Sequence, residues 1–434
     1  MDKRGDGDMM SAQKTSLLDI GKLIHSDHSA LSAIAPDLLD TAKDHLNNAS
    51  FPTTRTEAWK YTRTTRISSK EWQLREVTTE VDIAPYRIEN IDCNLVVFVN
   101  GFLRNDLCKV ERGLFLLETF QEASDLKSLI HQLISDSSES TDIFELLSVS
   151  HCTDGMALNV TGVVSKPFHF IFLQTGKDVF ACPMLIVNCA ENAKLDLIVS
   201  HHSSEGSSTW FNASLHVNLE KGSTFNYYKV QNDSSESFSH IMESIHQSDN
   251  STSNLVNVTL SGGWIRNNVD IRVDGSGCEA NLAGCYAPTG KEHLDNHTVV
   301  DHIKARSNSN ELYKGVVFDQ GRAVFNGKVF VREQAQKTNA YQQNANIVMS
   351  DDAVVNSKPE LEIYADDVKC SHGSTTGQID EEALFYLRSR GLSEMSARKL
   401  MVSAFFADVL DRIELKELRS HVVSKLIENG VMLS

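Results

Sequence analysis

Hydrophobic residues along this chain change their spacing twice, and the two changes divide the chain into three regions. From about Ser11 to Asn48 they recur every three or four residues, starting with Leu17 and Leu18, which predicts amphipathic helices. From about Asn94 to His372 they gather in short runs typical of strands, and afterwards the helical spacing returns. We therefore predict an N-terminal helical domain over 1–90, a β core over 91–374 and a C-terminal helical domain over 375–434.

The β-rich region carries a weak internal repeat. Pairs of small residues are separated by about the length of one β-solenoid coil, as in Ala193–Ser223 and Ala323–Ala353. Each of these small residues is followed by a strand-like run. No proline occurs between Met184 and Ala287, which suits continuous strand pairing. These features favour a solenoid or β-helix over a sandwich. The polar segment Ser135–Thr141 is expected to be a solvated loop.

Composition narrows the classes of function. A formal charge of −17 argues against binding of nucleic acid and favours solubility or a basic protein partner. No apolar run is long enough to span a bilayer, and the charged start of the chain lacks the apolar stretch of a secretory signal. We therefore expect a cytoplasmic protein that does not bind membranes.

The eight cysteines do not form a recognisable metal or redox motif. None belongs to a CxxC pair, so neither a zinc ribbon nor a thioredoxin-like site is predicted. In a reducing compartment most should be free thiols packed as small apolar residues.

Cys370 and His372 are the most informative pair of side chains. Residues two apart on a strand share a face, so the thiol and the imidazole would lie side by side if the strand continues through Ser371. We expect regular structure to stop there, where a chain can present chemistry to a partner. Two ligands do not complete a zinc or iron–sulfur site. The pair is therefore either a buried thiol beside a hydrogen-bonded imidazole or half of a site completed across an interface.

Two other motifs are weaker evidence for a functional site. Gly284–Glu292 imitates a phosphate-binding loop, but it has one spacer too many and Glu292 replaces the Ser or Thr that would hold Mg²⁺. We expect a turn there and no nucleotide binding by this chain. His293, His297 and His302 would be divided between two faces if they lie on a strand, which favours structural or surface roles.

The C-terminal region predicts short helices with wide apolar faces. Asp380 is placed as the N-cap of a first helix, Gly391 as the residue after its end, and Ser393 as the cap of the next. Leu400, Met401 and Phe405 are among the apolar residues of the second helix. These faces serve either the core or the docking of a partner.

Long segments of the chain resemble the SufD family, which belongs to the scaffold complex of bacterial Suf iron–sulfur cluster assembly. The resemblance runs from Arg55 to Gly391. The segments that carry it are Arg55–Thr62, Val99–Gly101, Tyr313–Gly315, Phe325–Lys328, Ala335–Ala340, Pro359–Gly373 and Leu384–Gly391.

The resemblance implies a right-handed parallel β-helix flanked by helical parts, and a non-catalytic role beside SufB and two copies of the ATPase SufC. It matches His372 to a histidine at the SufB–SufD interface, where a transient iron–sulfur cluster is thought to form, and Cys370 to a nearby cysteine. Ser374 departs from the usual alanine. The C-terminal helices are implied to dock SufC, and the residues expected to do so are Phe385, Leu400, Met401 and Phe405.

Three alternatives remain open at this stage. The chain could be the SufB-like main scaffold, although the Cys-Ser-His-Gly sequence and the scarcity of cysteines after Cys285 favour SufD. It could be a β-helix enzyme acting on carbohydrate, but Asp366 and Asp367 would face opposite ways on a strand. In isolation it could form a homodimer through the surface meant for SufB.

Overall fold

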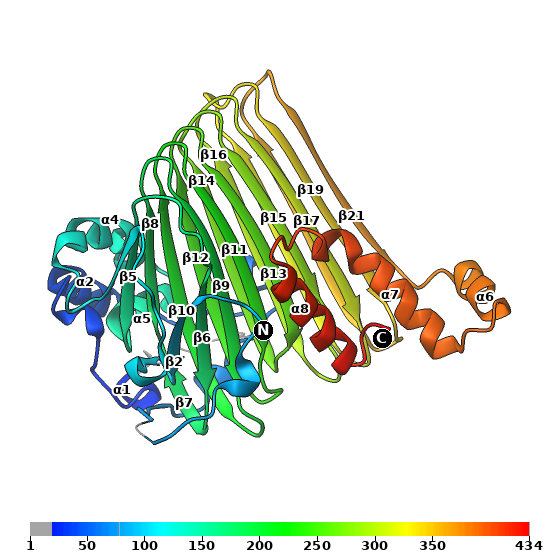
Figure 1. The fold of residues 1–434 in the computed structure, drawn as a ribbon, viewed down its shortest axis with the longest axis horizontal. Helices are drawn as coiled ribbons and strands as arrows, with labels where there is room; N and C mark the ends of the chain where they lie inside the picture. Colours follow the sequence, from blue (N-terminus) through cyan, green and yellow to red (C-terminus); the bar gives the residue numbers. More distant parts are fainter. Residues whose placement is uncertain (1–19, 78, 434) are drawn as a thin grey trace, which may run out of the picture.

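The molecule is a parallel β-helix built from two long sheets, as the strand pattern predicted (Figure 1). The computed structural model describes residues 20–77 and 79–433, so the expected helical residues Leu17 and Leu18 lie outside the described part. The first sheet contains β1 (Gln73–Leu74), β4 (Phe115–Thr119), β5 (Gly155–Val160), β7 (Lys177–Ala181), β8 (Met184–Cys189), β10 (Ser208–Leu219), β12 (Phe238–Gln247), β14 (Trp264–Val273), β16 (His293–His302), β18 (Arg322–Val331) and β20 (Val354–Ile363).

The second sheet faces the first across the lumen of the β-helix. Its strands are β2 (Asn94–Val99), β3 (Phe102–Leu103), β6 (Phe168–Gln174), β9 (Lys194–Ser203), β11 (Thr224–Asn232), β13 (Thr252–Ser261), β15 (Glu279–Tyr286), β17 (Asn308–Val317), β19 (Asn339–Val348) and β21 (Lys369–Gly377). From β6 to β21 each strand pairs in parallel with the equivalent strand of the next coil. The chain therefore alternates between the sheets and climbs by one coil at each circuit.

Small buried residues stack at the corner before the strands of the second sheet. Ala193, Ser223, Ser251 and Cys278 each precede such a strand, and all are at most 1% exposed. Large side chains would not fit at a corner where successive coils lie one strand spacing apart. This stacking confirms the weak repeat in the sequence and excludes a sandwich.

Helices close the N-terminal end of the β-helix. Two short ones, α1 (Ile20–Leu23) and α3 (Thr65–Ser68), precede the sheets. α4 (Lys127–Ser138) and α5 (Ile143–Ser150) pack against β10, and α2 (Pro36–Leu46) packs on them (Figure 1). The prediction of strands from Asn94 onward missed the helices α4 and α5. The predicted loop at Ser135–Thr141 is wrong in its first half, because the Ser135 and Ser138 hydroxyls bond to helix carbonyls and α4 continues to Ser138.

Two C-terminal helices lie on the outer face of the second sheet, and a third extends beyond it. The described helices are α6 (Glu381–Ser389), α7 (Glu394–Leu410) and α8 (Lys416–Glu428). Asp380 and Ser393 cap α6 and α7 as predicted, and Gly391 has the positive φ of +99° expected just after a helix end. α7 lies against β15 and β17 and α8 against β13, whereas α6 projects from the body (Figure 1).

The lumen changes character along the β-helix. Near the helix-covered end it is aromatic, with Phe172 stacked against Phe98 at 5.0 Å between ring centroids. Further along it becomes polar: Lys229 donates to Glu243 at 2.6 Å, and Tyr286 donates to Asn346 at 2.7 Å. Every one of these side chains is at most 5% exposed. None of the described helices is long and apolar enough to cross a lipid bilayer.

Candidate site at the open end of the β-helix

In the part of the chain that the structure describes, nothing pairs with the last coil of the β-helix. β20 pairs there only with β18 and β21 only with β19, so each is the final strand of its sheet and presents a free edge. The residues of β20 are half-buried for most of its length, and those of β21 are mostly exposed. Free edges present unpaired backbone N–H and C=O groups, which can pair with strands of another chain.

Cys370 and His372 lie together on this last coil. In β21, Cys370 pairs with Ala340 and His372 with Gln342, and both partners are buried in the lumen. Neighbours in register on parallel strands point to the same face, so the thiol and the imidazole form the last inward-facing row of the second sheet. Cys370 is half-buried against the lumen core, while His372 is exposed. Their predicted placement on one face is therefore confirmed.

One detail of the prediction is wrong. Regular structure does not stop at the pair, because β21 continues through Gly377 and pairs with β19 up to Ile347. The hydroxyl of Ser374 donates to Ser357 of β20 at 2.8 Å and so links the two sheets at the open end. The pair thus lies within a paired strand, which holds its backbone more firmly than a loop would.

The surroundings of Cys370 disfavour its ionised form. Burial raises the pKa of the Cys370 thiol, which favours the protonated form until a metal or a cation displaces the proton. Among the described residues no group of three or more His, Cys, Asp or Glu side chains is arranged to hold a metal ion. Cys370 and His372 thus offer two donors, and the described residues bring no third His, Cys, Asp or Glu ligand beside them.

The other candidate histidines on the β-helix are held by hydrogen bonds or ion pairs. His293 and His297 lie on the outer face of β16 beside Asp295, whose carboxylate also accepts from Arg266 at 2.8 Å. His302 points inward and contacts the Ser309 hydroxyl at 2.9 Å, so the expected division between two faces is confirmed. Gly284–Tyr286 belong to β15 and a loop follows, in which Glu292 accepts the backbone N–H groups of Gly262 and Thr289.

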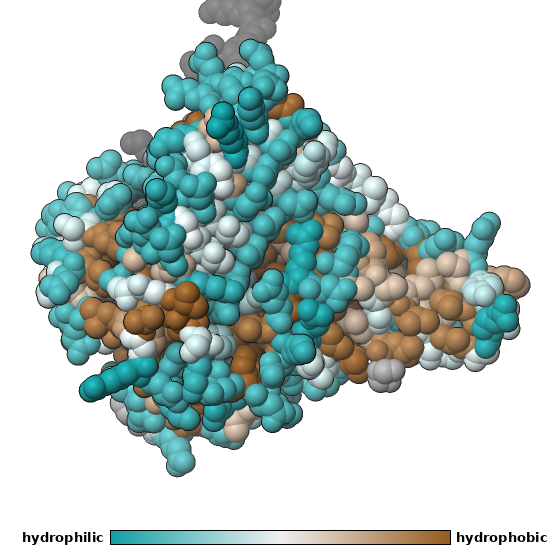
Figure 2. Space-filling view, turned by 45° about the horizontal axis from the view of Figure 1, so that its top comes forward, coloured by the Kyte–Doolittle hydropathy of each residue, from teal (hydrophilic) through white to brown (hydrophobic). Residues whose placement is uncertain are grey.

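The residues expected to dock a partner differ in exposure. Phe385 of α6 is 73% exposed and Leu400 of α7 is 37% exposed. Met401 is half-buried among apolar residues of α6 and α7, and Phe405 is half-buried where α7 packs on the second sheet, with its ring under the ammonium of Lys314. Figure 2 shows apolar residues gathered on the projecting arm that carries α6. Phe385 and Leu400 are thus accessible, together with Tyr386 and Met395, which the sequence reasoning did not single out.

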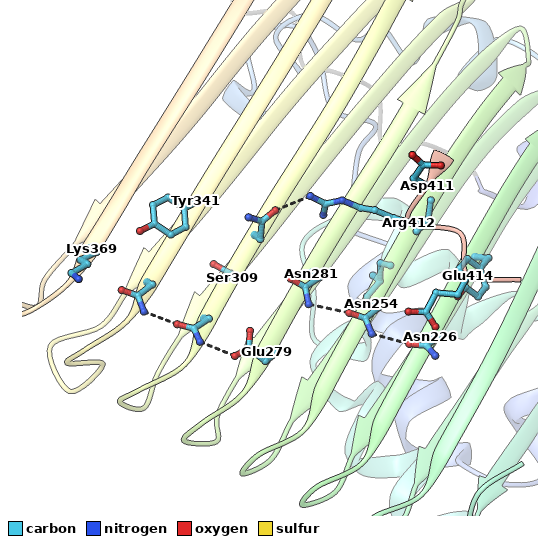
Figure 3. Close-up of a pocket in the computed structure, with 16 residues that line it drawn as sticks. Asn226, Asn254, Glu279, Asn281, Ser309, Tyr341, Lys369, Asp411, Arg412 and Glu414 are labelled. Carbon is cyan, nitrogen blue, oxygen red and sulfur yellow. Dashed lines mark hydrogen bonds between the residues drawn. The ribbon is translucent and has the colours of Figure 1, made fainter. Parts of the chain in front are cut away.

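A polar groove on the outer face of the second sheet was missed by the sequence reasoning. Its floor is a ladder in which Asn281 donates to Asn254 at 2.9 Å and Asn254 to Asn226 at 2.8 Å (Figure 3). The α7–α8 turn, with Arg412, forms one wall, and the hollow measures about 780 Å³. Asparagines recurring one coil apart were the available signal. The groove lies on the face opposite to Cys370 and His372, so it is separate from their site.

Comparisons with known proteins agree on one family. Residues 172–405 match the family model described as SUF system FeS cluster assembly, SufBD core domain. The chain is 28% identical to an iron–sulfur cluster assembly SufBD family protein of Synechocystis sp. over 88% of both chains. It is also 28% identical to the iron–sulfur cluster assembly protein SufD of Escherichia coli, over 89% of this chain and 91% of that protein. A chloroplastic protein of Arabidopsis thaliana, ABCI7, is 27% identical over 88% of this chain and 83% of its own length.

Proposed function

The chain belongs to the SufBD family of iron–sulfur cluster assembly proteins, and from this membership we propose that it is the SufD-type subunit of a scaffold complex. In this proposal it catalyses no reaction and binds no nucleotide. It pairs with SufB at the open end of the β-helix, docks the ATPase SufC through its C-terminal helices, and works in the cytoplasm. The nascent cluster forms between Cys370 and His372 on this side and ligands of SufB on the other.

One observation carries the proposal: the two metal-capable side chains form the last inward row of an uncovered coil. A cluster bound there would be enclosed only when a second chain covered the coil. The two free strand edges of β20 and β21 could supply backbone hydrogen bonds to that second chain. Site and interface would then form together, which suits a cluster that is assembled and later released.

The same arrangement separates the two predicted partners in space. The open end would face SufB, whereas the exposed Phe385 belongs to α6, which projects beyond β21, and Leu400 belongs to α7, which packs on the outer face of the second sheet. Only Gln378 and Ile379 separate the end of β21 from the N-cap of α6 at Asp380. A movement of α6 imposed by a docked ATPase would therefore reach β21 through a very short connection.

The site is tested by replacing His372 with Ala in cells that depend on this system. We expect cluster assembly to be lost while the chain still co-purifies with SufB and SufC, since an exposed side chain contributes little to folding. His45→Ala, at another exposed histidine, is the matched control and should assemble clusters normally. Normal assembly by the His372 variant would remove the site from the proposal.

The docking surface is tested by Phe385→Asp. A charge on an apolar contact residue should release SufC while SufB is retained, because the two surfaces are separate. Tyr341→Asp changes another exposed aromatic side chain, in the groove, and should leave SufC bound. Retention of SufC by the Phe385 variant would place docking elsewhere on the chain.

A further inference from the structure

A row of polar side chains lies directly behind His372. Glu311 on β17, Gln342 on β19 and His372 on β21 are paired in register, so the three share the inward face at successive coils. Neighbouring strands lie about 4.8 Å apart, which brings the Gln342 side chain within reach of the imidazole. Glu311 and Gln342 are each 3% exposed, so the row runs from the buried lumen out to the site.

The orientation of the Gln342 amide is determined from the buried side. Its Nε2 donates to the Glu311 carboxylate at 2.7 Å. A carboxylate only accepts hydrogen bonds, so the nitrogen of the amide must face Glu311 and the oxygen must point elsewhere. Within residues 20–77 and 79–433, Gln342 Oε1 has no hydrogen-bond partner although it is buried. A buried acceptor without a partner is costly, so the Gln342 oxygen calls for an explanation, and a contact with a neighbouring donor is one.

The opposite sheet leaves room for this amide. Gly327 of β18 faces it across the lumen, and a Cβ placed there would lie 2.3 Å from Gln342 Nε2, 2.7 Å from the Phe325 ring and 2.9 Å from Gln342 Cδ. The backbone of Gly327 does not have a positive φ, so its conformation does not require glycine. The absence of a side chain at this position instead accommodates the Gln342 amide beside Glu311.

We propose that Gln342, held by Glu311, is the positioning residue of His372. Its amide oxygen accepts a hydrogen bond from one imidazole nitrogen, which leaves the other nitrogen unprotonated and directed at the incoming cluster. Metal-binding histidines generally donate their second ring N–H to such an acceptor, which sets the tautomer and the orientation of the ring. The purpose of this positioning rests on the proposed function of His372. The hydrogen bond between Gln342 and His372 can itself be observed without a cluster.

The test compares Gln342→Leu with Gln343→Leu. Gln343 is the next residue on β19, exposed on the other face, and provides the matched control. The readout is the ¹⁵N chemical shift of the His372 ring nitrogens in the isolated full chain, with His372→Ala used to assign the signals. We expect one tautomer to be favoured by about fivefold in the wild type and the Gln343 variant, the bias given by a hydrogen bond of ordinary strength. The Gln342 variant should lose this bias.

A second variant covers the case in which Gln342→Leu does not fold. Gly327→Ala keeps the Gln342 side chain but displaces its amide, so it should reduce the same tautomer bias. An unchanged tautomer ratio in either folded variant would overturn the positioning role.

Cluster retention in the purified complex separates this inference from the proposed function. Loss of clusters in both His372→Ala and Gln342→Leu supports the two together. Loss in His372→Ala alone, with the tautomer ratio unchanged in Gln342→Leu, overturns the positioning role and leaves the proposed function standing. Clusters retained in His372→Ala contradict the proposed site, while the tautomer ratio still decides whether Gln342 orients the ring.

Discussion

The two ends of the β-helix differ in the side chains that fill the lumen and in whether helices cover them. At the N-terminal end, helices α2, α4 and α5 cover the first sheet, and the lumen is filled by aromatic rings such as Phe98 and Phe172. At the C-terminal end the last coil is uncovered, and the lumen behind it contains amides and carboxyls. Polar groups in the interior stabilise less than apolar ones because they must first lose their hydration. Stabilising aromatic contacts are thus concentrated at one end, and the proposed site lies at the other.

This division matches what each end is proposed to do. Solenoids generally need protected terminal coils to stay soluble, and here one end is protected by the chain's own helices. The other end exposes strand edges that natural proteins usually cover or blunt. A partner at that end would bury the edges and enclose Cys370 and His372 in the same step.

The largest expected difference between the ends concerns core packing. Phe172→Ala, in the aromatic part of the lumen, should lower the free energy of unfolding by about 3–5 kcal/mol because it leaves a cavity among stacked rings. Leu361→Ala in β20 should cost only about 1 kcal/mol, since this side chain is already partly in water. Urea denaturation of both variants measures the contrast. Equal losses at the two positions would contradict a division of stability between the ends.

A smaller effect concerns pH and the polar part of the lumen. Burial raises the pKa of Glu311 from its ordinary value of 4.5 to about 6. Between these values the folded protein holds a proton that the unfolded chain has released, so the free energy of unfolding falls as the pH rises through this window. The loss contributed by this group is at most about 2 kcal/mol.

This pH effect is isolated by comparison with Glu311→Gln, which cannot titrate. Wild type and variant should differ in how their urea midpoints change between about pH 4.5 and 6, and should run in parallel above that range. Other buried carboxyls, such as that of Asp233, also have a raised pKa, but they contribute equally to both proteins. Parallel curves throughout would show that the Glu311 carboxyl has the same pKa in the folded and unfolded protein, so that burial does not raise it.

The smallest expected effect on stability lies at the exposed arm. Phe385→Ala should change the free energy of unfolding of the isolated chain by less than about 0.5 kcal/mol, as is usual for exposed positions. Phe406→Ala is the matched control in the next helix, where the ring is fully buried, and should cost about 3–5 kcal/mol. A large loss from Phe385→Ala would mean that α6 packs on the body of the chain, and the arm would then be a poor docking surface.

Local periodicity was enough to predict the strands and the shared face of Cys370 and His372, because side chains alternate strictly along a strand. The same reasoning failed for α7, where Phe405 and Phe406 are adjacent and both apolar. Only the packing of α7 on the second sheet decides that Phe406 is buried and that Phe405 lies at the edge under Lys314. The helical wheel alone does not contain that information.

The row of Glu311, Gln342 and His372 could not be predicted for a different reason. These residues lie about one coil apart in sequence, and a shift of the register by one residue would place Gln343 beside His372 instead. The coils differ in length, so the register cannot be counted from the sequence. The helices α4 and α5 were missed because a short apolar run such as Ile143–Leu147 fits a buried strand as well as a helix.

The position of the helix-covered end has a consequence for synthesis. The covering helices and the aromatic coils come first along the chain, so they leave the ribosome before the polar coils and the uncovered edge. Each later coil can then add to a finished template, as repeat proteins grow by nearest-neighbour contacts. We expect the exposed strands to be completed last, which shortens the time during which they could pair with the wrong chain.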